Sequence, residues 1–384
     1  MGSKNSDSLE TEQILIEGNS NVRILILNRP WQLNALSHQM ISGLLEKFLT
    51  YEEDPNVKLL IVKGQGRAFC SGGDVASVAR LGNEGRWDLA AKFFWEEYVL
   101  NFTLATNMTP QVSLLNGIVM GGGAGVSIHG RFRVVTEKTV FATPETSLGL
   151  FPDVGATYFL PRLPGFLGEY VGLTGTRLDG AEMLACGLAT HFVFSSKLAS
   201  LEEELSKVDT SNPDIICTVI DRFSQKVPLK EGSAFRRLNV IDKFFSQRTV
   251  EEILSALEKE AANGADAWLS ATIKSLKAAS PTSLKISLRS IREGRLQGLD
   301  QCLIQEYRMV CHVLRKKFSK DFYEGCRAIL IDKDRNPKWE PSKLELVSEK
   351  MVDHYFSKVD EEKWRDLELP RRKNTKDIFA RPRL

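Results

Sequence analysis

Short apolar runs rich in β-branched residues alternate with stretches of helical periodicity through the first half of the chain. A strand over Val22–Leu27, a helix over 37–51 and a strand over 57–62 form a β-α-β pattern. Further strands are predicted at Gln111–Leu115, Phe132–Val135 and Val140–Ala142, and a further helix over 122–129. Glycine and proline crowd residues 149–168, which predicts an ordered loop without a helix.

The pattern changes after residue 195, where charged segments with leucines at helical spacing replace the β-branched runs. Thr249 and Glu252 have the spacing of a capping box, which marks a helix start. Helices are predicted over 251–262, 265–279, 281–293 and 319–331. The predicted fold class is therefore α/β, with a core over 12–195 and a mainly helical C-terminal region, ending in an exposed tail, over 196–384.

Composition narrows the functional classes. The 384 residues carry 51 basic and 49 acidic side chains, so the net charge of +2 gives no overall field for nucleic acid or for stable membrane association. No apolar run reaches the roughly 18 residues that cross a bilayer. The six cysteines show no C-x-x-C spacing, which predicts reduced thiols and no metal site.

Two glycine clusters follow predicted strands, at 69–74 (FCSGGD) and 120–125 (MGGGAG). Glycine lets a backbone approach a ligand closely, and a helix start presents unpaired N–H groups. One N–H group from each cluster would form an oxyanion hole; the alternative is tight packing of a strand against a helix. The dinucleotide motif G-x-G-x-x-G and the phosphate loop G-x-x-x-x-G-K-[ST] are both absent from the sequence, which weakens nucleotide-binding interpretations.

Two carboxylates, Glu145 and Asp153, stand eight residues apart across a glycine and proline break. Apolar neighbours would partly desolvate both groups, which raises carboxylate pKa values and suits proton transfer or nucleophilic attack. The alternative is structural, with Glu145 capping a helix and Asp153 starting a turn.

Four segments resemble, in order, the signature series of the enoyl-CoA hydratase/isomerase (crotonase) superfamily: 27–36 (LNRPWQLNAL), 69–74, 120–125 and 144–145 (PE). Four more resemble the 3-hydroxyisobutyryl-CoA hydrolase branch of that superfamily: 94–98 (FWEEY), 127–131 (SIHGR), 148–153 (LGLFPD) and 333–339 (KDRNPKW). The resemblance covers roughly residues 12–355. It implies a spiral of ββα turns, frequent oligomerisation, an acyl-CoA substrate and no separate cofactor.

The resemblance also implies roles for individual residues. The oxyanion hole would be formed by the N–H groups of Gly73, or its neighbour Gly72, and of Gly122. Glu145 and Asp153 match the catalytic pair of the hydrolases.

Two further residues match substrate-binding positions, namely Glu97 and Gly121. Enoyl-CoA hydratases resemble this chain at Glu145 but carry a second glutamate at the position of Gly125 and usually a glycine at that of Asp153. The sequence therefore favours hydrolysis of a short 3-hydroxyacyl-CoA. The alternatives are an enoyl-CoA hydratase or isomerase, and a non-catalytic acyl-CoA-binding protein. The resemblance leaves open the choice between 3-hydroxyisobutyryl and 3-hydroxypropionyl groups, and between nucleophile and general base for Glu145.

The two ends of the sequence carry possible targeting signals. Pro382-Arg383-Leu384 resembles the S-K-L peroxisomal address, so the predicted location is the peroxisome and an import receptor is a predicted partner. The N-terminus lacks an amphipathic leader; the cytoplasm, or the mitochondrion if a leader was trimmed, is the alternative. Residues 1–6 fit the myristoylation pattern, but a chance match is the favoured interpretation because the pattern is short and one acyl chain anchors weakly.

Overall fold

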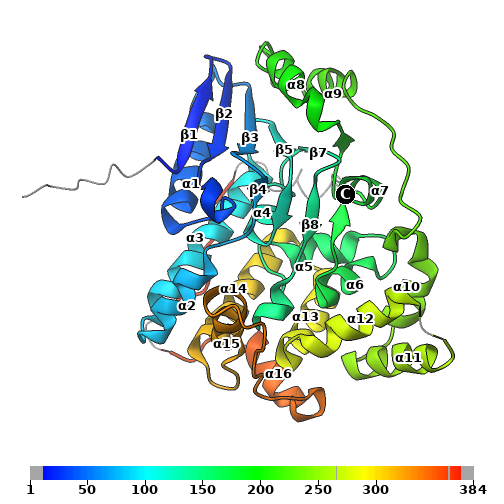
Figure 1. The fold of residues 1–384 in the computed structure, drawn as a ribbon. Helices are drawn as coiled ribbons and strands as arrows, with labels where there is room; N and C mark the ends of the chain where they lie inside the picture. The colour runs from blue at the N-terminus through cyan, green and yellow to red at the C-terminus, as the bar shows by residue number, and fades with distance from the viewer. Residues whose placement is uncertain (1–11, 265, 362–363, 373–384) are drawn as a thin grey trace, which may run out of the picture.

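The computed structural model describes residues 12–264, 266–361 and 364–372 (Figure 1). Its strands form a six-stranded sheet of order β1-β2-β3-β5-β7-β10 and a four-stranded sheet of order β4-β6-β8-β9. The strands are β1 Ile14–Gly18, β2 Val22–Leu27, β3 Leu59–Gly64, β4 Ala68–Cys70, β5 Gln111–Leu115, β6 Ile118–Met120, β7 Phe132–Val135, β8 Val140–Ala142, β9 Leu178–Asp179 and β10 His191–Phe192.

The chain winds as a spiral because consecutive strands alternate between the two sheets. β3 lies in the larger sheet and β4 in the smaller one, and β5–β6 and β7–β8 repeat this step. Strands from successive turns pair in parallel, as β3 does with β5 and β4 with β6. Helix α1 (His38–Glu53) joins β2 to its parallel neighbour β3, while α2 (Val75–Asn83) and α3 (Trp87–Thr106) lie between the first and second turns. The predicted β-α-β unit and the ββα spiral are confirmed.

Alternate residues of β2 face two different apolar clusters, as the period of two in a strand requires. Leu25 and Leu27 point into the main core, which α1 and α3 also line. Ile24 and Ile26 point to the other face of the sheet, where they pack with buried residues of α8 (Leu198–Leu205) and α9 (Pro213–Asp221). The six-stranded sheet is therefore buried on both faces.

The second half of the chain is helical, as predicted. Figure 1 shows the helices from α10 onward, in yellow-green to orange, gathered below the sheets, with α8 and α9 apart from them at the upper right. α13 packs on α6, and α14 packs on α3. The helices not yet named are α4 Gly122–Gly125, α5 Ala156–Phe159, α6 Leu167–Thr174, α7 Gly180–Ala185, α10 Leu238–Phe245, α11 Val250–Ala262, α12 Ala267–Ala278, α13 Pro281–Gly294, α14 Leu299–Arg315, α15 Asp321–Cys326 and α16 Glu349–Phe356.

Two local predictions were wrong. The helix predicted over 122–129 is a single turn, α4, followed by turns, because three of its four residues are glycines, which disfavour a helix interior. The segment 149–168 is not free of helix, since it contains α5, a 3₁₀ turn at Leu160–Arg162 and the start of α6. Prolines limit helix length there but still permit a short turn that begins with proline near its N-terminus.

The helix starts follow the local chemistry of the sequence. Thr249 and Glu252 form the predicted capping box at the start of α11. The 319–331 prediction corresponds to α15 followed by a π-helical turn at Arg327–Ile331. One main apolar cluster includes residues from both halves of the chain, and a domain division at 195/196 stays a prediction. Among the described residues, the helices are all too short or too polar to cross a membrane.

Candidate active site

The two glycine clusters meet at one edge of the four-stranded sheet. β4 runs into Gly72 and Gly73, and β6 runs into Gly121 and Gly122; because these strands are parallel neighbours, their carboxyl ends lie together. A Cβ atom built on Gly122 would lie 3.1 Å from the nitrogen of Gly73. Gly72 at φ +118° and Gly121 at φ +48° hold backbone conformations that favour glycine.

The N–H groups of Gly73 and Gly122 are available to a ligand in the described part of the chain. Leu36 and Asp74 form the backbone hydrogen bonds beside Gly73, and the Gly73 N–H donates none to a described carbonyl. Gly122 is the first residue of α4, so its N–H has no acceptor within the helix. The two N–H groups therefore have the arrangement that an oxyanion hole needs.

One face of α3 lies directly beneath this glycine-rich backbone. A Cβ atom on Gly73 would lie 3.1 Å from the Phe93 ring, and one on Gly122 would collide with Glu97 Oε1. Four residues further along α3, Asn101 Nδ2 would lie 2.8 Å from a Cβ atom on Gly125. The glycines are therefore required for close packing on α3 as well as for the backbone conformation. The packing alternative given for the clusters is compatible with an oxyanion hole, which stays a prediction.

The two predicted catalytic carboxyls both face a cavity of about 550 Å³, together with Glu97 and the glycine clusters. Glu145 starts the 3₁₀ turn Glu145–Leu148, and Asp153 lies in the loop before α5. Glu145 is 5% exposed, Asp153 4% and Glu97 2%. The structure thus brings together every residue predicted for the site.

Burial sets the protonation of these carboxyls. Burial, followed by the charge of Asp153, holds the pKa of Glu145 well above its usual range. Burial and the charges of Asp153 and Glu145 do the same to the pKa of Glu97. Burial also raises the pKa of Asp153, to about 6, against the opposing effect of a hydrogen bond from Tyr98. At neutral pH, Asp153 is therefore the most readily ionised member of the group.

Two buried oxygens of this group lack hydrogen-bond partners. Glu97 Oε1 and Glu145 Oε2 are both inaccessible to solvent and unpaired among the described residues. A buried polar atom without a hydrogen-bond partner destabilises the folded protein. A bound ligand that supplies the missing hydrogen bonds would account for both atoms.

Sequence reasoning missed two residues that hold Asp153 in place. The Tyr98 hydroxyl donates to Asp153 Oδ2 at 2.7 Å. Glu306 of α14 accepts hydrogen bonds from the N–H groups of Gly155 and Thr157, at 2.8 and 3.1 Å. The FWEEY segment contains Tyr98 but does not indicate that its side chain points toward Asp153. The sequence around Glu306 carries no signal for this site.

The mouth of the cavity combines apolar and basic groups. Trp31 is 65% exposed, and Leu330 lies at the same rim with the basic side chains of Arg67 and Lys333. The lining thus changes from buried carboxyls inside to exposed basic and aromatic groups outside.

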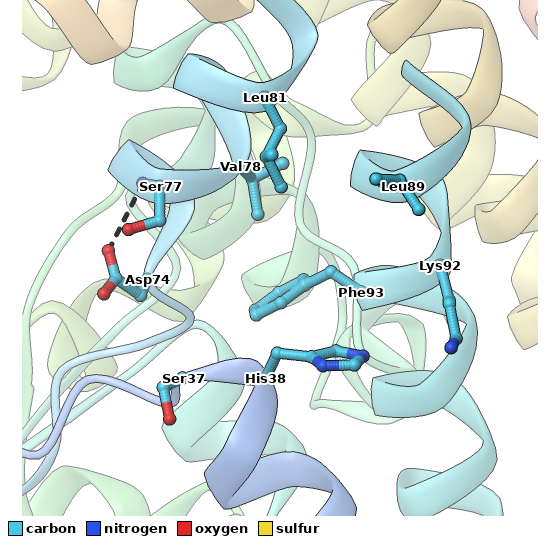
Figure 2. A pocket seen from close by; sticks show the side chains of 9 residues that line it. All are labelled: Ser37, His38, Asp74, Ser77, Val78, Leu81, Leu89, Lys92 and Phe93. Carbon is cyan, nitrogen blue, oxygen red and sulfur yellow. Dashed lines mark hydrogen bonds between the residues drawn. The ribbon is translucent and has the colours of Figure 1, made fainter. Parts of the chain in front are cut away.

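A second cavity of about 310 Å³ lies between the start of α1, α2 and α3 (Figure 2). Asp74 lines both cavities, while Phe93 lines the second one and also contacts Gly73. In Figure 2 the Phe93 ring projects from α3 into the space between the helices, opposite Val78 of α2. Phe93 therefore separates the second cavity from the glycine-rich backbone.

Spiral sheets, paired glycine N–H groups and buried carboxyls together define a crotonase-type site. The family model described as enoyl-CoA hydratase/isomerase matches residues 22–356, so the chain belongs to the enoyl-CoA hydratase/isomerase family. The crystal structure of a carnitinyl-CoA dehydratase from Mycobacterium thermoresistibile matches with a TM-score of 0.83 and 34% identity, covering 93% of this chain and 98% of that one.

Within the family, the chain is similar to named hydrolases. It is 66% identical over 362 residues to 3-hydroxyisobutyryl-CoA hydrolase 1 of Arabidopsis thaliana, covering 94% of this chain and 95% of the relative. It is 49% identical over 358 residues to the mitochondrial 3-hydroxyisobutyryl-CoA hydrolase-like protein 1 of Arabidopsis thaliana, covering 93% and 89%.

Proposed function

We propose that this protein hydrolyses 3-hydroxyisobutyryl-CoA to 3-hydroxyisobutyrate and free coenzyme A. The observation that carries the proposal is the single cavity in which the Gly73 and Gly122 N–H groups face Glu145 and Asp153. The 66% identity to a protein named for this activity supports the choice of substrate.

The glycine N–H groups bind the thioester oxygen and stabilise the negative charge that develops on it. Removal of one such donor typically costs about 2.7–4 kcal/mol of barrier. Because backbone groups supply both donors, they are fixed before the substrate arrives.

Glu145 and Asp153 carry one proton and one negative charge between them at neutral pH, because burial and mutual repulsion oppose ionisation of both. The charged member attacks the thioester carbon or takes a proton from the attacking water. The protonated member gives its proton to the sulfur as the C–S bond breaks. Coenzyme A leaves as the thiol. If the carboxylate attacked, water then hydrolyses the resulting anhydride and frees the carboxyl; if it acted as a base, water has already attacked the thioester. In both routes water supplies the hydroxyl of the acid.

Glu97 recognises the 3-hydroxyl group of the acyl chain. Burial and the neighbouring carboxyl charges hold its pKa well above the usual range, which favours the protonated form, and its Oε1 is unpaired, so it can exchange hydrogen bonds with a hydroxyl. Gly121 supports this pocket, since a Cβ atom there would lie 3.0 Å from Glu145 Oε1. The coenzyme A portion extends along the mouth of the cavity, where Arg67 and Lys333 bind its phosphates. The reaction requires no separate cofactor.

The test is coenzyme A release from 3-hydroxyisobutyryl-CoA, followed as free thiol, by the wild-type chain and by Glu145→Gln and Asp153→Asn. Both substitutions keep side-chain size and remove the ability to ionise, so each should reduce kcat at least a thousandfold. Unchanged turnover in both variants contradicts the proposal. A parallel panel with 3-hydroxypropionyl-CoA measures the acyl preference.

The hydratase alternative has a separate test. Gly125 stands where the hydratases carry a second glutamate, and Asn101 and Val154 fill the space beside it. Addition of water to crotonyl-CoA, followed as loss of the conjugated absorbance, should therefore be absent. Tight acyl-CoA binding without turnover of any ester would instead favour a non-catalytic protein.

The place of the reaction follows from its substrate. We assign this reaction to valine degradation, and we expect the protein to form a homo-oligomer. The tripeptide Pro382–Leu384, which lies outside the described residues, directs the chain to the peroxisome. A fluorescent protein fused to the N-terminus should mark peroxisomes and become diffuse when Leu384 is deleted; mitochondrial signal would instead match the relative named as mitochondrial.

A further inference from the structure

Three side chains suited to metal binding meet on the far side of the six-stranded sheet from the main core. His191 belongs to the edge strand β10, and Cys217 and Asp221 lie one turn apart on α9, which Figure 1 labels. One ligand atom from each lies within 4.8 Å of the others. His191 and Cys217 are 26 positions apart, so no short sequence motif indicates this set, and the sequence predicted no metal site.

The distances between these atoms match the edges of a tetrahedron around zinc. Cys217 Sγ lies 3.6 Å from His191 Nε2 and 3.7 Å from Asp221 Oδ2, and His191 Nε2 lies 3.4 Å from Asp221 Oδ1. Zinc bonds of about 2.3 Å to sulfur and about 2.1 Å to nitrogen and oxygen, at tetrahedral angles, require separations of about 3.4–3.6 Å. The two Asp221 distances involve different oxygens, so the carboxylate would turn about its Cβ–Cγ bond to present one oxygen to a cation held between the three groups.

The hydrogen bonds around Thr190 set the tautomer of His191. Thr190 Oγ1 donates its only hydrogen to the carbonyl of Arg133 at 3.2 Å and lies 2.8 Å from His191 Nδ1. Nδ1 must then carry a hydrogen and donate it to Thr190. This leaves the lone pair on Nε2, which faces Cys217 and Asp221, as in metal-binding histidines held by a second hydrogen bond.

The charge of the set suits a divalent cation. A metal-bound thiolate at Cys217 and the carboxylate of Asp221 would together neutralise two positive charges. Burial and the charge of Asp221 raise the pKa of the free Cys217 thiol, so the thiolate would form together with a bound cation and not before it. Asp221 is 62% exposed, so water can reach the remaining coordination position.

We propose that His191, Cys217 and Asp221 form a zinc site that fastens α9 to the edge strand β10. Nitrogen, sulfur and one carboxylate oxygen are the ligands that zinc takes in proteins. The site shares no lining residue with the active-site cavity, so it acts on the packing of α9 and not on thioester hydrolysis.

The test is titration of the chelator-stripped full-length protein with zinc chloride against a chromophoric chelator. One zinc ion per chain should bind, and the melting temperature should rise with it. Cobalt substitution should give the near-ultraviolet charge-transfer band of a thiolate ligand. Thr190→Val should weaken zinc binding by about 10–100-fold, the usual effect of losing a partner of a metal-binding histidine.

Cys217→Ser and His191→Asn should abolish the thermal shift and the cobalt band. Asp214→Asn is the matched control, because Asp214 is an acidic residue one turn earlier on α9 that is not part of the set. Hydrolytic activity reports that each variant is folded, since none of these residues lines the active site. Absence of a one-to-one zinc complex in the wild type would contradict the proposed zinc site. So would a zinc affinity of Cys217→Ser equal to that of the wild type.

Discussion

The Tyr98 hydroxyl donates a 2.7 Å hydrogen bond to Asp153 Oδ2, in a region from which solvent is almost excluded. Tyr98 follows Glu97 directly on α3, so one helix contacts both the proposed substrate-binding carboxyl and a proposed catalytic one. The bond favours the ionised form of Asp153 in a site where burial and like charge oppose ionisation. It therefore decides which carboxyl of the group carries the charge.

Tyr98→Phe should move the acid limb of kcat/KM to higher pH. In the wild type, activity should fall as the pH drops below about 6, where Asp153 gains a proton. Loss of a hydrogen bond to a charged group costs about 1.5–3 kcal/mol, which corresponds to a rise of about 1–2 pH units in the limb. Tyr355→Phe, at another buried tyrosine, is the control and should leave the profile in place. An unmoved limb in Tyr98→Phe would argue against Asp153 as the titrating group.

Glu306→Ala should lower both stability and kcat. The substitution leaves the buried N–H groups of Gly155 and Thr157 without an acceptor, and each unsatisfied donor costs about 1–3 kcal/mol of folding free energy. The loop that carries Asp153 should then shift, so kcat should fall more than tenfold while KM changes little, because the glycine N–H groups are untouched.

Glu169→Ala separates this effect from general destabilisation. Glu169 is also fully buried and pairs with Arg295 on α13's C-terminal side, but it does not line the active-site cavity. This variant should lose stability, measured by urea denaturation, and keep its kcat at low temperature. Equal kcat losses in the two variants would contradict a positioning role for Glu306.

Short-range signals made the fold and the glycine clusters predictable. β2, β5, β7 and β8 have the predicted bounds, because β-branched runs between turn residues indicate strands directly. The strands β4 and β6 were missed because their residues overlap the glycine clusters, which were interpreted as loops and a helix start. The two glycine clusters meet because β4 and β6 pair in parallel. Without these strands, the sequence did not predict that the clusters lie together.

The support of the site could not be predicted from local pattern. α3 is buried on nearly all sides, so its apolar periodicity is weak and does not tell which residues face Asp153. Glu306 lies 151 residues from Gly155, and only the packing of α14 against the core brings them together. Such contacts depend on tertiary structure, which one sequence does not reveal.

Gly125→Glu should not convert the protein into a hydratase. A Cβ atom at this position would lie 2.8 Å from both Asn101 Nδ2 and Val154 Cβ, so the larger side chain overpacks the site at a cost of about 1–3 kcal/mol or more. We expect a lower melting temperature and no hydration of crotonyl-CoA. Gly125→Ala should be destabilising alone and should recover in part when combined with Asn101→Ala, because the contact with Val154 Cβ remains. Simple additivity of these two changes would contradict the contact.

Phe93→Ala should extend the range of acyl chains, because the Phe93 ring separates Gly73 from the second cavity of about 310 Å³. Each methylene that enters the merged space contributes about 0.8 kcal/mol, so kcat/KM for linear acyl-CoA esters, relative to 3-hydroxyisobutyryl-CoA, should rise roughly fourfold per added carbon. Phe93→Leu opens less space, limits the loss of core packing and should give a smaller gain. Val78→Ala enlarges the same cavity but keeps the ring, so its chain-length profile should equal that of the wild type. A folded Phe93→Ala protein with unchanged selectivity would show that the acyl chain does not point toward this ring.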